Sequence, residues 1–109
     1  MAITINIYYS GKDGNAVKFA KEMLLSGIVA AIRNEKGNLR YDYFLPMDDS
    51  ETVLLIDAWQ DQTALDTHHA SPLMEQIAAL RDKYDLRMCV ERYVTDETAP
   101  ERDKKFIRS

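Results

Sequence analysis

Apolar and polar positions follow two different periods in the first half of the chain. The segment ITINIYY, residues 3–9, is rich in β-branched and aromatic residues and ends at a Ser-Gly turn, which predicts a strand. Beyond it, apolar residues recur at steps of three and four from Asn15 to a stop at Lys36-Gly37. This spacing predicts a helix, which Gly27 bends or divides, with these residues on one face: Val17, Ala20, Leu24, Ile28 and Ala31.

Three more segments have the composition of strands. NLRYDYFLP, residues 38–46, and TVLLIDAW, residues 52–59, are joined by the acidic turn MDDSE and predict a β-hairpin. The segment LRMCVERYV, residues 86–94, predicts the fourth strand.

Two shorter helices are expected between the hairpin and the last strand. Asp61 can cap a helix that runs to about His69. Ser71 can cap another helix whose first position is Pro72, where the missing amide proton does no harm. The second of these helices carries an apolar face made of Leu73, Ile77, Leu80 and Tyr84.

The order of these elements, β-α-β-β-α-β, is that of a ferredoxin-like α+β fold with an antiparallel sheet. In this fold the helices cover one face of the sheet, and the first and third strands lie in its middle. In the third strand Leu54, Ile56 and Ala58 point away from Val53 and Leu55, so both faces of that strand are largely apolar. The chain's own helices cover only one face, which predicts a homodimer that packs through the other. The alternative is that a loop or the C-terminal tail covers it.

Composition narrows the class of protein. A chain of 109 residues, 46% of them apolar, suits one domain, expected over residues 1–95, with a charged tail over 96–109. Lys and Arg are scattered and the net charge is −4, which argues against a nucleic-acid partner. The single Cys89 excludes an intrachain disulfide and is expected to be a small buried hydrophobe. Without a signal-like or membrane-spanning segment, we expect a cytoplasmic protein that binds no membrane.

Both histidines of the chain lie together in ALDTHHASP, close to its one tryptophan. His68 follows Ala64 by four residues and so shares the inward face of its helix, whereas His69 lies about 100° further round, at the edge. Trp59 ends the preceding strand, so it and His68 are expected to border one cavity between sheet and helices. Asn6 and Tyr8 are expected to line the same cavity. The alternative is that Trp59 and His68 are structural core groups.

These residues resemble the antibiotic biosynthesis monooxygenase family. The segments EKGNLRYDYF, TVLLIDAWQDQTALDTHHASPLM and VERY carry the resemblance, which covers about residues 3–95. Within them the family pattern matches at Gly37, Trp59, His68, Ser71 and Pro72, while Asp57 stands where Glu is more usual. Several members have a second histidine where this chain has Leu73, a role that His69 can fill only from the adjacent position. The resemblance implies a dimeric α+β barrel.

The family includes cofactor-free oxygenases of quinols, and the resemblance is closest to these and to the branch of quorum-signal isomerases. It implies a substrate that is a small aromatic or carbonyl compound, oxidised by O₂ without metal or cofactor. No spacing typical of metal ligands and no glycine-rich phosphate loop occurs. On this hypothesis His68 is the general base, Asn6 hydrogen-bonds the developing oxyanion, and Trp59 forms an aromatic wall. The expected substrate-binding residues are Tyr8, Tyr41, Asp57, His69 and Leu73.

Other functions stay open. An isomerase of a phosphorylated carbonyl compound would use the same base and a cation for the phosphate, for which Arg33 and Arg40 are candidates. Arginines at such positions are, however, more often solvated or salt-bridged than bound to a phosphate. Haem degradation is disfavoured because Ala78 stands where those enzymes carry the iron-ligating histidine. A non-catalytic ligand-binding or assembly module is the third alternative.

Overall fold

The fold was obtained as a computed structural model, which describes residues 1–108. Its elements, in chain order, are β1 (Ile3–Ser10), α1 (Asn15–Leu25), α2 (Ile28–Arg33), β2 (Asn38–Phe44), β3 (Thr52–Trp59), α3 (Gln62–His69), α4 (Leu73–Lys83), β4 (Arg87–Val94) and a 3₁₀ helix (Glu101–Phe106). The predicted first helix is divided, because Gly27 adopts φ 88° between α1 and α2. The expected order of strands and helices is confirmed.

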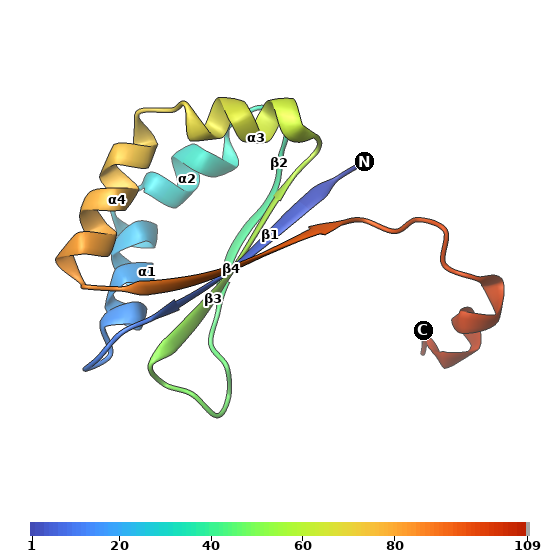
Figure 1. Cartoon of the computed structure of the whole chain (residues 1–109), viewed down its shortest axis with the longest axis horizontal. Coiled ribbons are helices and arrows are strands. Elements are labelled where there is room, and N and C mark those ends of the chain that lie inside the picture. Colours follow the sequence, from blue (N-terminus) through green and yellow to red (C-terminus); the bar gives the residue numbers. More distant parts are fainter. Residues whose placement is uncertain (109) are drawn as a thin grey trace.

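The four strands form one antiparallel sheet in the order β2-β3-β1-β4, with the first and third strands in the middle as predicted. Figure 1 shows all four α-helices on one side of this sheet. The chain therefore has the expected ferredoxin-like α+β fold.

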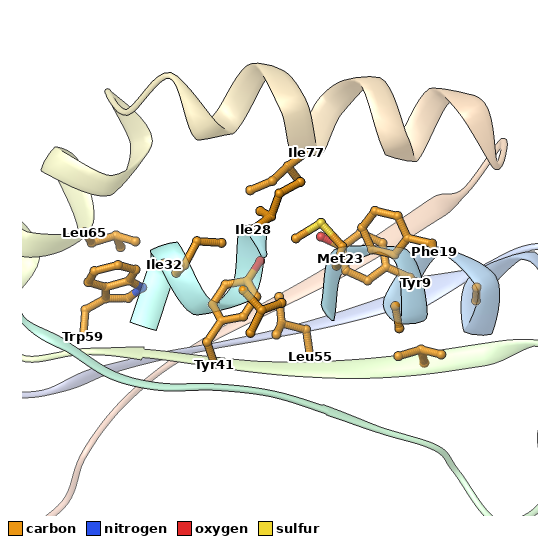
Figure 2. Packing of buried hydrophobic residues seen from close by; sticks show 14 of the residues in the cluster. Tyr9, Phe19, Met23, Ile28, Ile32, Tyr41, Leu55, Trp59, Leu65 and Ile77 are labelled. Atoms are coloured by element: carbon orange, nitrogen blue, oxygen red, sulfur yellow. The ribbon is translucent and has the colours of Figure 1, made fainter. Parts of the chain in front are cut away.

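Register decides which side chains face the helices. In β3, Val53, Leu55, Asp57 and Trp59 are buried beneath them, and β1 presents Ile3 and Tyr9 to the same side. Figure 2 shows Trp59, Leu65, Tyr41 and Ile77 packed between the sheet and the helices that cover it. The core thus lies in a single layer, and any cavity within it is lined by this face of the sheet.

Within the described residues, the other side of the sheet carries no helix; we call this side the open face. It presents half-buried Leu54 and Ile56 from β3 and exposed Phe44 from β2. Cys89 lies opposite Tyr8 on this face and is exposed, so the expectation that it is buried is wrong. The reason is that β4 is an edge strand, and its open side packs against no other element.

The predicted residues accept hydrogen bonds at the N-termini of α3 and α4, but one helix begins later than expected. Asp61 accepts a hydrogen bond from the Ala64 amide at 2.8 Å, as expected. The hydroxyl of Ser71 accepts from the Leu73 amide at 3.2 Å, but α4 begins at Leu73, one residue later than predicted.

Beyond β4 the chain leaves the body of the molecule as an arm that ends in the 3₁₀ helix (Figure 1). Within residues 1–108, no helix has the length and apolar character needed to cross a membrane. The division between a domain over 1–95 and a tail over 96–109 stays a prediction.

Candidate active site

A cavity of about 410 Å³ lies between the helix-facing side of the sheet and the helices α3 and α4. Most of its wall is apolar, formed by Ile5, Ile7, Leu55, Leu65, Met74, Ile77, Met88 and Val90. The other eight lining residues carry polar side-chain atoms: Tyr9, Tyr41, Asp57, Gln62, His68, His69, Arg81 and Arg92. Apolar walls that bear polar groups able to orient a ligand are the usual form of a small-molecule site.

His68 lies on the inner wall of this cavity and is only 2% exposed. Its Nδ1 lies 3.1 Å and 3.2 Å from the two carboxylate oxygens of Glu35. When Nδ1 carries the proton it donates to this carboxylate, and Nε2 is left as the acceptor of the neutral ring. The arrangement therefore holds an imidazole ready to accept a proton at Nε2.

Glu35 is a site residue that the sequence analysis did not identify. It lies 33 positions before His68, in the turn after α2. The available signal was its place two residues before Gly37, inside the segment EKGNLRYDYF that carries the family resemblance.

The turn that contains Glu35 packs closely against α3. Gly37 adopts φ 85°, and a Cβ added there would lie 2.5 Å from the Cβ of Ala64. The Gln60 amide also donates a hydrogen bond to the Gly37 carbonyl at 2.8 Å. Since Ala64 is one helical turn before His68, this close approach brings Glu35 and His68 together.

Trp59 supports His68 from the other side. The two rings stack with centroids 4.6 Å apart and an interplanar angle of 28°. The Trp59 indole N–H donates to Asp57 Oδ1 at 2.7 Å, and Trp59 itself is fully buried. Trp59 is thus placed to orient the imidazole. Contrary to the prediction, it is not among the residues that line the cavity.

Asp57 does line the cavity, at 5% exposure. Burial raises the pKa of this carboxyl from 3.8 to about 6, although the charge of His68 and the Trp59 hydrogen bond both act to lower it. Desolvation is the dominant cause, so Asp57 can hold a proton in mildly acidic solution.

Two tyrosines add hydroxyl groups to the wall. Burial raises the pKa of Tyr9 to about 12 and the pKa of Tyr41 well above its usual value. Both hydroxyls therefore keep their protons at neutral pH and can donate hydrogen bonds. The Tyr41 ring lies 6.5 Å from that of His68, centroid to centroid. Tyr41 thus lines the cavity, and its role in substrate binding stays a prediction.

His69 lines the cavity from an exposed position, 5.8 Å from His68 between ring centroids, which agrees with its predicted place at the edge.

The structure does not bring Asn6 and Tyr8 to the cavity. Asn6 pairs with Ile56 and Tyr8 with Leu54, so both lie on the open face, whereas Ile5 and Ile7 line the cavity. Asn6 Oδ1 is buried and has no hydrogen-bond partner among the described residues. The prediction for these two residues is wrong because the apolar face of β1, not its polar one, is turned toward the helices.

Three further candidates also lie elsewhere. Leu73 packs against the core but does not line the cavity. Arg33 and Arg40 both form ion pairs with Asp42, at 3.0 Å and 3.1 Å, and neither reaches the cavity. The arginines that line it are Arg81 and Arg92, which the sequence analysis did not identify.

Among solved structures, the chain resembles a candidate antibiotic biosynthesis monooxygenase from Deinococcus radiodurans, with 23% identity, a TM-score of 0.75 and coverage of 92% of this chain and 97% of that one. It also resembles SnoaB, a cofactor-independent oxygenase from Streptomyces nogalater, with 16% identity, a TM-score of 0.73 and coverage of 92% and 98%. At these identities the likeness shows the fold.

No curated protein matches the chain significantly. The family model described as "Antibiotic biosynthesis monooxygenase" matches residues 2–80, which is most of the chain. With the fold and this match together, the chain belongs to the antibiotic biosynthesis monooxygenase family.

Proposed function

We propose that this protein is a cofactor-independent monooxygenase that oxidises a quinol or a related hydroxylated aromatic compound with O₂. The observation that carries the proposal is His68, a buried imidazole held at Nδ1 by Glu35 on the wall of an apolar cavity. A base in such a place can ionise a bound hydroxyl group while water is kept away.

The chemistry needs no external reductant, because the substrate supplies the electrons. His68 takes a proton from a ring hydroxyl, and the electron-rich phenolate passes one electron to O₂. The aryloxyl radical and superoxide then join, which forms one C–O bond at a ring carbon. Cleavage of the O–O bond, with loss of the hydrogen on that carbon, gives a hydroxyquinone and one water molecule. The proton held by His68 leaves with this water.

Other cavity residues have defined roles in this proposal. Tyr41 keeps its proton and is buried beside His68, so it replaces Asn6 as the hydrogen-bond donor to the phenolate oxygen. Trp59 is a positioning residue, since it stacks on the imidazole and does not line the cavity.

Oxygen uptake with a panel of hydroquinones, in buffer containing a metal chelator, tests the proposal. His68→Gln and His68→Ala should each lower turnover by about two to four orders of magnitude, the usual contribution of a general base. His69→Ala should cost far less, because His69 lies at the exposed edge. Circular dichroism of each variant checks that the fold survives, and the glutamine variant guards against the cavity that alanine leaves beside Trp59.

Full activity of both His68 variants would exclude His68 as the base, and equal loss in His68→Ala and His69→Ala would mean that the two imidazoles act together.

A second candidate function is favoured by Arg81 and Arg92, which suit a phosphorylated carbonyl substrate. Proton exchange into a ketose phosphate without oxygen uptake would support this isomerase. The absence of both oxygen uptake and proton exchange would favour a non-catalytic binding module.

A further inference from the structure

We propose that the cavity selects small molecules with an apolar, aromatic body and one anionic group, a carboxylate or a phosphate monoester, which Arg81 and Arg92 hold at the entrance. This inference deepens the proposed function and rests on it for the identity of the reacting end. It concerns which quinol-like compounds bind, and its evidence is the charge and exposure of the residues at the cavity entrance.

Arg81 and Arg92 approach the cavity from opposite sides. Arg81 projects from α4 and is half-buried, whereas Arg92 projects from β4 and is exposed. Arg81 contacts Met88 of β4 and Arg92 contacts Gln62 of α3, so the two guanidinium groups meet the cavity at different points along β4, and each can contact an anion that enters it.

Neither guanidinium forms an ion pair within residues 1–108. Arg92 donates to the neutral amide oxygen of Gln62 at 2.6 Å, and Arg81 donates to the thioether sulfur of Met88 at 2.8 Å. By contrast, Arg33 and Arg40 share the carboxylate of Asp42. The positive charges at the cavity are therefore not neutralised by the protein.

Exposure of the lining residues shows which end of the cavity is the entrance. On the β4 side Val90 is 55% exposed and Met88 40%, while Leu55 at the opposite wall is 1% exposed. His68 lies at the closed end, and the arginines lie toward the open one. A ligand with its hydroxyl at the base would thus place its other end near the two guanidinium groups.

The charges around the cavity favour an anion. Asp57 is the one carboxylate among the lining residues, against the two guanidinium groups of Arg81 and Arg92, and it is only 5% exposed. The positive charge of Arg81 also reaches the cavity wall, because it acts to lower the pKa of Tyr9, against the rise caused by burial. The whole chain carries a net charge of −4, whereas guanidinium groups outnumber carboxylates among the residues that line this cavity.

Guanidinium groups bind carboxylates and phosphates through paired N–H donors, which gives both affinity and orientation. An aromatic ring between apolar walls, with its anionic group on these donors, would point its hydroxyl toward His68. The inference therefore names a substrate class and a direction of binding.

Binding without turnover tests it. Under anaerobic conditions, the fluorescence of Trp59, the one tryptophan of the chain, reports a ligand beside His68. We compare 2,5-dihydroxybenzoate with 2,5-dihydroxybenzamide, which share the hydroquinone ring and differ in charge. A third ligand, 4-hydroxyphenyl phosphate, distinguishes carboxylate from phosphate recognition. At least one anionic ligand should bind ten-fold or more tightly than the carboxamide.

Variants assign this preference to the two arginines. Arg81→Gln and Arg92→Gln should each reduce it to less than about three-fold. Arg87→Gln is the matched control, because Arg87 lies on the same strand as Arg92 and does not line the cavity. Equal binding of charged and neutral ligands to the wild type, or the same loss in Arg87→Gln, would overturn the inference.

The outcome is separable from that of the proposed function. Anion preference without oxygen uptake would support the inference and contradict the oxygenase. Oxygen uptake from neutral hydroquinones, with no preference for anionic ones, would contradict the inference and leave the oxygenase in place.

Discussion

His68 is held on both sides, by the Glu35 carboxylate at Nδ1 and by the Trp59 ring against its plane. A side chain so restrained loses little further freedom when substrate binds, which is what preorganisation of a base requires. The same packing means that removal of the imidazole leaves an empty space beside Trp59. His68→Ala should therefore destabilise the fold more than the same substitution of a solvent-facing histidine would.

Glu35 is a positioning residue, and its substitution should change the state of the His68 ring. Glu35→Ala removes the acceptor at Nδ1, so turnover should fall at least ten-fold, whereas Glu35→Gln keeps an acceptor oxygen and should retain more activity. The ¹⁵N shifts of the ring should show one tautomer, protonated at Nδ1, in the wild type and a mixture in Glu35→Ala. Glu75→Ala, an exposed acid on α4, is the control. Unchanged ring shifts in Glu35→Ala would contradict this role.

Asp57 gives a prediction for the dependence of stability on pH. Because burial raises its pKa from 3.8 to about 6, the folded state binds this proton more tightly than the unfolded state. That contribution to stability is complete below pH 3.8 and is lost as the pH rises through about 6. Asp57→Asn avoids the loss and can still accept the Trp59 indole hydrogen bond.

The advantage of Asp57→Asn over the wild type in free energy of unfolding should therefore grow between pH 4 and pH 8, by up to roughly 3 kcal/mol. Urea unfolding at equal protein concentration measures it. Asp48→Asn, on an exposed residue of the hairpin turn, should show no such growth. A constant difference for Asp57→Asn across this range would contradict the raised pKa.

Among the elements, the contact between the turn after α2 and the first turn of α3 matters most for the site. Neither segment contains the whole site, since Glu35 comes from the turn after α2 and His68 lies in the last turn of α3, one helical turn beyond Ala64. Gly37 allows the contact because it has a positive φ and no side chain to meet Ala64.

Gly37→Ala should therefore destabilise the protein more than Gly14→Ala does. Both glycines have positive φ values, 85° and 73°, so both substitutions cost about 1 kcal/mol in backbone strain. Only at Gly37 would the new methyl group meet a neighbour, at 2.5 Å from Ala64, which should cost a further ~1–3 kcal/mol. Urea denaturation of the two variants makes the comparison. Equal losses would show that the turn and α3 can move apart freely.

At the scale of the whole molecule, the uncovered open face needs explanation. Leu54 and Ile56 of β3 lie on it, and Phe44 of β2 and Tyr93 of β4 on the same face are 40% and 50% exposed. We propose that a second copy of the chain covers this face, since an apolar sheet surface without a helical layer is otherwise in contact with water.

Sedimentation should then give about twice the chain mass of 12.5 kDa. Leu54→Asp or Ile56→Asp should dissociate or unfold the dimer, because each places a charge in the apolar contact. Leu25→Asp is the matched control, since Leu25 is 87% exposed at the end of α1 and its substitution should leave the mass unchanged. A wild-type monomer at micromolar concentration would contradict the dimer.

The sequence by itself determined the elements, their order and the type of sheet. Periods of two and of three to four residues are properties of the local backbone, so strands such as TVLLIDAW and the division of the first helix at Gly27 could be recognised without tertiary information. The inward place of His68 and the outer place of His69 follow from the same helical period.

Tertiary structure alone decided what meets His68. Alternation groups Asn6 with Tyr8, but it does not tell which side of β1 the helices cover, and the polar side turned out to be the open one. Glu35, Arg81 and Arg92 reach the site through contacts between elements distant in the sequence. Such contacts depend on how the layers pack, for which a single sequence has no local signal, because the free energy that selects them belongs to the whole core and not to any one segment.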